Sequence, residues 1–208
     1  PLLTRRGRAT LARFADGGTV VFSVDRASDI LQVISQSKRH GFRAVISGGA
    51  EAWMVADALA DANVPVLLNP LQNLPSSFDA LGSRLDNAAL LDAAGVTIAF
   101  TGAGSHNARK VRQMAGNAVA HGLPHAVALA GLTRVPAEIF GASEEQGRIQ
   151  ERGAANLVLW SGDPLDVTSL ADMVLINGQN VPLTSRQTEL RDRYLPENPE
   201  MPRAYIKP

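Results

Sequence analysis

Residues 98–116 read IAFTGAGSHNARKVRQMAG, and this stretch indicates the fold class most clearly. An apolar run leads into a Thr-Gly-Ala-Gly-Ser loop, which leads into a basic segment with helical spacing. Strand, loop and helix in this order are typical of α/β enzymes, which carry their chemistry on such loops. This loop holds glycine and alanine where an acidic side chain would be expected. The stretch therefore predicts the outline of an active site and leaves its chemistry open.

Three similar units precede this one along the chain. Apolar runs at 18–24, 42–49 and 64–70 predict strands, and amphipathic segments at 27–41, 50–63 and 84–95 predict the helices that follow them. The run at 64–70 is apolar on both faces, as in parallel strands. Four successive βα units predict an α/β fold with a parallel sheet and right-handed crossovers.

The pattern changes after Gly122. A helix and a shorter helix follow, broken near Thr133 and Pro136, and then short β segments with turn residues at Gly162-Asp163 and Asn177-Gly178. The prolines of the tail predict an extended or poorly ordered end. We therefore divide the chain into an N-terminal extension, a body of βα units, a set of short strands and a Pro-rich tail: 1–17, 18–145, 146–183 and 184–208.

Composition narrows the function classes. Twenty basic residues balance twenty acidic ones, which argues against nucleic acid as a partner because a basic face is its usual mark. No window approaches ~18 uninterrupted apolar residues, so no membrane span is expected. The first residues lack the apolar centre of a signal peptide. We expect a soluble protein, cytoplasmic or periplasmic, and its 0 cysteines exclude disulfides and thiolate metal ligands.

An ordered series of motifs in the C-terminal third carries a family resemblance. Its members are Thr133/Pro136/Ala137, Gly147/Ile149/Gly153, Ala155-Asn156-Leu157-Val158, Gly162-Asp163-Pro164 and Val174/Gly178. In this order they resemble the C-terminal end of the amidohydrolase superfamily. Upstream, GGAEAW, VPVLL, LDNAALLDAAGV and HNARKVRQMAGNAVAHGL are similar to its imidazolonepropionase-like branch, so that the resemblance covers roughly residues 18–183.

The resemblance implies a TIM-type (β/α)8 barrel plus a small β-sandwich built from both ends of the chain. Four of the barrel strands are legible here, so this chain resembles the second half of such a barrel with the C-terminal strands of the sandwich. A half barrel leaves two sheet edges and an apolar face uncovered. We therefore expect a partner, either a second copy in a homo-oligomer or a complementary amidohydrolase N-terminal chain.

The positions at which the resembling enzymes hold their metal do not match. Ser23 stands where the fifth strand supplies a His, and Gly48 or Gly49 where the sixth supplies another. The stretch 101–104 replaces the eighth-strand Asp that binds metal and moves the proton of the attacking water. Neither hydroxyls nor glycines provide the imidazole or carboxylate ligands that zinc needs in such a site. We expect no metal bound by this chain alone, and zinc only if a complementary N-terminal half supplies ligands.

Polar residues at the expected ends of the strands are the candidates for binding a small molecule. The strongest are Ser23, Asp25, Asn69, Thr101, His106 and Asn107, and weaker ones are Gln72, Asn73, Ser76 and Ser105. A Ser-His-Asp arrangement from Ser23, His106 and Asp25 is formally open, since triads are recognised by geometry rather than by order. Asn69 also suits a turn before Pro70. No catalytic residue is assigned.

The remaining histidines and basic residues have structural interpretations. His40 and His121 each precede a glycine at a helix end, where a surface imidazole suits the helix dipole, and His125 opens a helix. The basic face formed by Arg109, Lys110 and Arg112 is interpreted as solvated. Two functions stay open: a non-catalytic amidohydrolase-like subunit that completes or scaffolds a barrel, or the C-terminal part of a metal-dependent hydrolase acting on non-peptide or cyclic amide C–N bonds.

Overall fold

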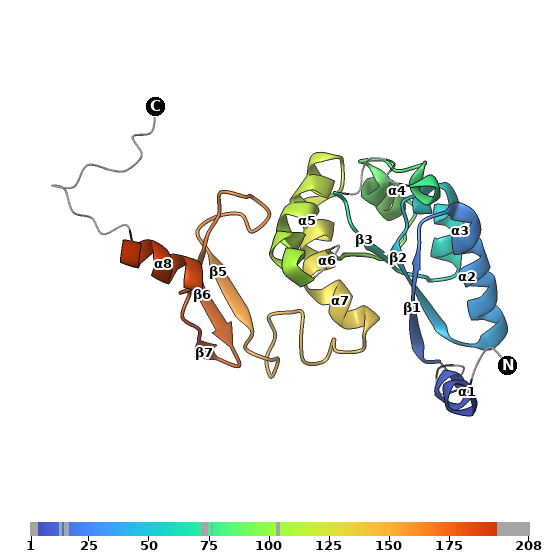
Figure 1. Cartoon of the computed structure of the whole chain (residues 1–208), viewed down its shortest axis with the longest axis horizontal. Coiled ribbons are helices and arrows are strands. Elements are labelled where there is room, and N and C mark those ends of the chain that lie inside the picture. Colours follow the sequence, from blue (N-terminus) through green and yellow to red (C-terminus); the bar gives the residue numbers. More distant parts are fainter. Residues whose placement is uncertain are drawn as a thin grey trace.

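Four parallel strands form the central sheet of the computed structural model (Figure 1). The structure describes residues 4–12, 14, 17–71, 75, 77–102 and 105–194, without the side chains of 105–107. The strands, in spatial order, are β1 (Thr19–Val24), β2 (Arg43–Gly48), β3 (Val66–Leu68) and β4 (Ile98–Phe100). The predicted α/β class and the parallel order of the four units are confirmed.

One face of this sheet packs against the crossover helices. These are α2 (Ala27–His40), η1 (Ala52–Val55), α3 (Ala56–Asp61), α4 (Asn87–Ala93) and α5 (Val111–Ala120). Ile46, Val66 and Ile98 from the strands share a buried cluster with the fully buried Ile30 and Leu59 from the helices. Figure 1 shows α2, α3 and α4 gathered on one side of the strands. This apolar layer is the core of the fold.

Helix α2 shows how the sequence specifies these elements. Ile30, Val33 and Ile34 recur at helical spacing, and all three are buried against the sheet. Its last turn carries basic residues, which suit the negative end of the helix dipole. Gly41 then adopts a left-handed conformation with φ 74° and donates its N–H to the Ser37 carbonyl at 2.9 Å. The predicted glycine C-cap is therefore confirmed.

The opposite face of the sheet is covered only in part. Side chains alternate along a strand, so Val45 and Ala99 lie on this face, where they pack against Val135 and Ile139. Those two residues belong to α7 (Arg134–Ile139), which follows α6 (His125–Leu132). Val21 pairs with Val45 in register and is 46% exposed. The part of this face near β1, the first strand of the sheet, is thus open to solvent.

A second, smaller sheet is antiparallel and lies beyond α5–α7 in Figure 1. Its strands are β5 (Leu157–Trp160), β6 (Ala171–Ile176) and β7 (Gln179–Asn180). Asn177 and Gly178 have φ values of 50° and 76° between β6 and β7. Positive φ at both central residues is the signature of a tight hairpin turn, as the Asn-Gly pair predicts. Apolar side chains such as Leu159, 59% exposed, remain uncovered on this sheet.

The loop between β5 and β6 joins the small sheet to the helices. Leu165 is buried in the main core, and its carbonyl lies against Gly116 of α5. Arg112 donates a hydrogen bond to the Pro164 carbonyl at 2.9 Å and contacts the Asp166 carbonyl. Its guanidinium also lies 4.8 Å from the centre of the Trp160 ring. Arg112 is therefore bound to the loop between β5 and β6, and its interpretation as part of a solvated face was wrong. The sequence did not indicate these contacts because the partners lie about fifty residues away along the chain.

A hydrogen bond between His125 and Asp163 reinforces the same junction. His125 Nε2 lies 2.9 Å from a carboxylate oxygen of Asp163, which also accepts the Leu165 N–H at 2.8 Å. The Leu165 amide first, and His125 second, hold the pKa of Asp163 below its usual value. His125 is thus the partly exposed helix-start residue that the sequence indicated, with a partner that the sequence did not reveal.

Two helices were not expected. Helix α8 (Arg186–Tyr194) occupies part of the tail for which an extended chain was predicted, and α1 (Arg5–Ala12) lies in the N-terminal extension. Ser185 and Thr188 exchange side-chain and backbone hydrogen bonds at the start of α8, which satisfies donors that a helix start leaves free. Residues 195–208 lie outside the described part of the chain. The prolines therefore did not prevent a capped helix just before them.

We expect Gly116→Ala to destabilise the protein although alanine favours helices. A Cβ at this position would lie 2.6 Å from the Leu165 carbonyl oxygen, a backbone atom held by buried neighbours. Overpacking of this kind costs about 1–3 kcal/mol, which exceeds the gain of about 0.5–1 kcal/mol from replacing a helical glycine. Urea unfolding measures the sign. Gln113→Ala, at an exposed position of the same helix, is the matched control, and a more stable Gly116→Ala variant would contradict the packing.

We expect the stabilising effect of Asp163 to disappear in acid. Because its folded pKa is depressed, the carboxylate stabilises the fold above its unfolded pKa of about 3.9, and that contribution is lost as the pH falls through the folded value. The difference in unfolding free energy between wild type and Asp163→Asn should shrink between about pH 6 and pH 2. Asp172→Asn, at an exposed carboxyl of the small sheet, is the control. A difference independent of pH would refute the pairing.

Candidate functional site

The carboxyl ends of the four strands lie at one edge of the sheet, and this edge carries the predicted site residues. Ser23 of β1 and Ser47 of β2 are direct partners in the parallel register, so their side chains share the partly open face. Asp25, Asn69 and Thr101 each follow one of the strands β1, β3 and β4 within a single residue. Four of the six strongest candidates are therefore brought to the same edge.

Asp25 is engaged with the backbone of the neighbouring loop. Its Oδ1 accepts the Ala50 N–H at 3.2 Å, and its carbonyl accepts the Glu51 N–H at 2.9 Å. The approach is so close that a Cβ on Gly48 would lie 2.6 Å from Asp25 Oδ1. The Asp25 carboxylate thus links the loops after β1 and β2, which is a structural role at the position where the sequence suggested ligand binding.

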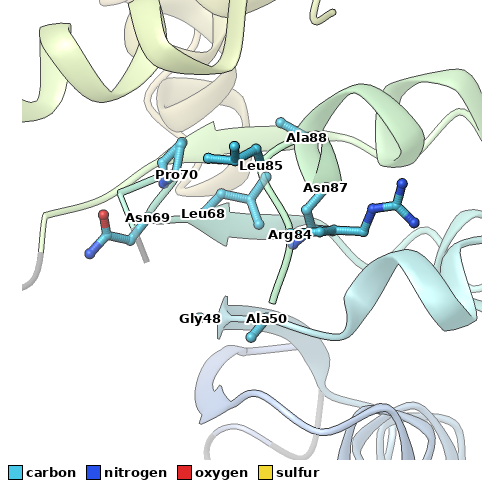
Figure 2. A pocket seen from close by; sticks show the side chains of 9 residues that line it. All are labelled: Gly48, Ala50, Leu68, Asn69, Pro70, Arg84, Leu85, Asn87 and Ala88. Atoms are coloured by element: carbon cyan, nitrogen blue, oxygen red, sulfur yellow. The ribbon is translucent and has the colours of Figure 1, made fainter. Parts of the chain in front are cut away.

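Asn69 and Thr101 also make local contacts. Asn69 Oδ1 accepts the Leu71 N–H at 3.3 Å, which is the turn geometry that the following proline favours. Figure 2 shows the Asn69 amide pointing away from the other residues of its pocket. The Thr101 N–H donates to the Leu68 carbonyl at 2.8 Å. Asn69 therefore has the turn role that the sequence left open as its alternative.

The remaining candidates cannot be placed by their side chains. Gln72, Asn73 and Ser76 lie outside the described residues. Ser105, His106 and Asn107 belong to η3 (Ser105–Lys110), whose first three side chains are likewise outside the description. The predicted contributions of His106 and Asn107 to a ligand site, and the formal Ser23–His106–Asp25 triad, remain predictions.

Glu51 connects three loops at this edge and was not among the sequence candidates. Its Oε2 accepts the Ala27 N–H at 3.0 Å, and its Oε1 accepts the Gly82 N–H at 3.2 Å. The indole of Trp53 donates to the Gly82 carbonyl at 2.9 Å, so both backbone groups of this glycine are bound. A Cβ on Gly82 would lie 2.5 Å from the Met54 methyl carbon. These contacts fix the long connection between β3 and α4 over the strand ends.

Charged groups strengthen this connection from outside. Arg26, after β1, lies 3.0 Å from Asp29 and 3.3 Å from Asp79 of η2 (Phe78–Ala80). The hydrogen bond that Arg26 Nε donates to Asp29 is the main cause of the raised pKa of Arg26. Arg84 pairs with Asp86 and lowers the pKa of that carboxyl by hydrogen bonding, while its guanidinium lies 4.5 Å from the Trp53 ring centre. These exposed pairs order the loop surface.

A small pocket lies between the β2 loop, the end of β3 and the start of α4 (Figure 2). Its volume of about 20 Å³ is that of a single small occupant. Asn87 is 9% exposed and donates from Nδ2 to the Gly49 carbonyl at 2.9 Å. Its Oδ1 is buried, and no donor among the described residues reaches it. The sequence pattern did not indicate Asn87, because this residue opens α4 and does not follow a strand.

The described residues do not fit a catalytic zinc. Within the described part of the chain, no group of three or more His, Cys, Asp or Glu side chains is placed to hold a metal ion. Gly48 and Gly49, where the resemblance places a His, have φ values of 105° and 69°. Ser23 is an exposed hydroxyl, and Asp25 already accepts a backbone amide. Among the described residues, the carboxylates of Asp25 and Glu51 at this edge already accept backbone amides, and they do not form a set of metal ligands.

Comparisons with known proteins point to amidohydrolases, although no family model matches the chain. The chain is 37% identical over 116 residues to amidohydrolase tasK of Hapsidospora irregularis, covering 51% of this chain and 12% of that protein. It is similar to the crystal structure of an amidohydrolase from Thermotoga maritima MSB8, with 29% identity and a TM-score of 0.76, over 85% of this chain and 46% of that one. It thus spans less than half of either relative.

A more distant structure shares the fold alone. An adenosine deaminase from Xanthomonas campestris with bound zinc gives a TM-score of 0.58 at 18% identity, over 90% of this chain and 53% of that one. Together these comparisons support the resemblance to amidohydrolases at the level of the superfamily. They do not single out the imidazolonepropionase-like branch. Among the described residues, no helix has the length and apolar character needed to cross a membrane.

We expect Glu51→Ala to loosen the loop over the strand ends. Removing both acceptors leaves the Ala27 and Gly82 amides without their partner, and a hydrogen bond to a charged group is worth about 1.5–3 kcal/mol. Hydrogen exchange at these two amides should accelerate, and the unfolding free energy should fall by about 2 kcal/mol. Glu51→Gln, which keeps one acceptor, should lose less. Glu145→Ala, at an exposed carboxylate, is the control, and unchanged exchange at Gly82 would contradict the role of Glu51.

Proposed function

We propose that this chain is the C-terminal half of an amidohydrolase-type barrel and that a partner completes it. The observation that carries the proposal is the four-stranded parallel sheet, whose helices cover one face and leave part of the other open at Val21. The likeness to the Thermotoga maritima amidohydrolase over 46% of that chain supports it. The motifs in 18–183 favour the imidazolonepropionase-like branch.

The partner supplies the missing half of the barrel. Strand β1 is the first in the sheet order, and an edge strand presents free backbone donors and acceptors to another chain. A complementary amidohydrolase N-terminal chain or a second copy of this chain would cover β1 and the exposed side of Val21. A closed barrel has no edges, which is the physical gain from the association.

In the assembled protein this chain serves chiefly as a scaffold. Metal-dependent hydrolysis needs an ion that lowers the pKa of its bound water to about 7 and a group that moves the proton. Ser23 and the two glycines at the end of β2 provide neither, and Asp25 is bound to the Ala50 amide. The loops of this chain then position a small-molecule ligand at the carboxyl ends of the strands through hydroxyl, amide and backbone groups.

The alternative function is that of the C-terminal part of a working hydrolase for non-peptide or cyclic amide C–N bonds. In that case the N-terminal chain holds most of the zinc ligands. The resemblance implies that these include the two histidines of a His-x-His strand in the first half of the barrel. Both tasK and the Thermotoga maritima protein are named amidohydrolases, which supports this alternative. The two functions differ in whether the partner brings a metal.

We expect the purified chain to retain well below one equivalent of zinc after dialysis, and to hydrolyse no cyclic imide, hydantoin or acyl-amino acid above background. Elemental analysis and light scattering of the same sample are the measurements. A species heavier than 22.0 kDa, as a homo-oligomer or with a second chain, is expected. Asp25→Asn is the matched variant and should leave metal content unchanged.

Three results separate the alternatives. A co-purifying chain with a His-x-His strand, together with zinc and turnover, would favour the hydrolase. A metal-free homo-oligomer would favour the scaffold. A well-folded 22.0 kDa monomer, or stoichiometric zinc lost in His106→Ala with measurable hydrolysis, would refute the proposed scaffold.

A further inference from the structure

The amide of Asn87 has a fixed orientation. Its Nδ2 donates to the Gly49 carbonyl at 2.9 Å, so exchanging the two amide atoms would bring two acceptors together. Asn87 is also 9% exposed, which prevents its side chain from turning freely into solvent. Oδ1 is therefore committed to one direction, and whatever lies there must donate a hydrogen bond.

This acceptor has no hydrogen-bond partner in the part of the chain that the structure describes. Oδ1 is buried, and no described residue donates to it. Buried side-chain oxygens almost always have a partner, because losing water without a replacement is costly. The unmatched atom belongs to a residue that lines the small pocket at the carboxyl ends of β2 and β3. Burial and position thus independently indicate an occupant.

The size of the pocket limits what the occupant can be. Its volume is about 20 Å³, whereas a water molecule requires roughly 10–15 Å³ by the same kind of measure. A buried water also needs further polar neighbours. The backbone of Gly48 lies in the same lining as Asn87. The space admits one non-hydrogen atom, and Asn87 Oδ1 requires that this atom donate a hydrogen bond.

The charges around the pocket favour a neutral donor. Among the described residues that line it, none is acidic and Arg84 is the one that carries a charge. The Arg84 guanidinium is paired with Asp86 and stacked on Trp53, and Figure 2 shows it directed away from the pocket. A positive charge beside a site without an acid disfavours an ammonium ion, since like charges repel in a poorly solvated place.

We propose that this pocket is a specific site for one neutral hydrogen-bond donor, an ordered water molecule held by Asn87 Oδ1. The water extends the polar surface of Asn87 towards the end of β3 and joins the start of α4 to the strand ends. Through this water, the loop at Gly48–Ala50, the end of β3 at Leu68–Pro70 and the start of α4 are connected around one pocket. This inference concerns the chain alone and does not depend on the barrel partner.

The test is water–protein NMR on the full chain. A held water gives NOE and ROE cross-peaks of opposite sign, as slow exchange requires, to the Asn87 amide protons and to the methyl groups of Leu68 and Ala88. Asn156 is the matched control, because its Oδ1 accepts the Asn177 N–H at 2.8 Å and the residue is exposed. Cross-peaks at Asn87 that match those at Asn156 would overturn the proposal.

Two variants and one added salt sharpen the result. Asn87→Leu removes the acceptor and should abolish the cross-peaks at Leu68 and Ala88, whereas Asn156→Leu leaves the pocket unchanged and should retain them. Replacing sodium chloride by ammonium chloride should leave the wild-type cross-peaks unchanged, and their loss would overturn the neutral donor. A high-resolution crystal structure of the wild type gives a second readout that does not depend on the variants folding. Water at Oδ1 supports the proposal, and a protein donor there overturns it.

Discussion

The burial of one face of a parallel sheet is the constraint on which the rest of this molecule depends. Parallel strands cannot be joined by tight turns, so each connection must cross back over the sheet, and here the crossovers place helices on the same face. Ile46, Val66 and Ile98 provide the apolar surface that these helices cover. Because each crossover returns the chain to the amino ends of the strands, the loops that leave the strands gather at the carboxyl ends. The candidate site lies at the carboxyl ends for this reason.

The architecture could be predicted because it depends on repeated local patterns. Apolar strands and amphipathic helices alternate four times along the chain. Gly41 ends α2, and the Asn177–Gly178 pair ends β6, because these residues adopt positive φ more easily than others. Helices α1 and α8 escaped prediction because neither buries a side chain, so no apolar stripe marks them. The role of Arg112 escaped because its partners lie in a distant loop. The hydrophobic periodicity of a segment indicates which of its side chains are buried. It does not indicate which distant loop a surface residue such as Arg112 contacts.

The candidate site was predictable in its position and less so in its members. The rule that parallel strands end at one edge brought Asp25, Asn69 and Thr101 together from the sequence alone. It could not reveal that Asp25 is bound to a backbone amide, nor that Glu51 connects three loops, since both depend on loop paths. Asn87 follows the long loop into α4 and contacts a carbonyl thirty-eight residues away, a relation that no local pattern encodes.

The backbone at the end of β2 also determines how readily a metal ligand could be introduced there. Gly48 and Gly49 both have positive φ, a region that residues with a Cβ rarely adopt. A side chain at Gly48 would meet Asp25, and one at Gly49 would approach Val66 at 3.1 Å. An imidazole introduced by one codon change would thus be strained in its backbone and crowded at its first carbon. Evolution or protein engineering would have to remodel the loop and its neighbours together, so a single substitution at Gly48 or Gly49 would not suffice to introduce a metal ligand.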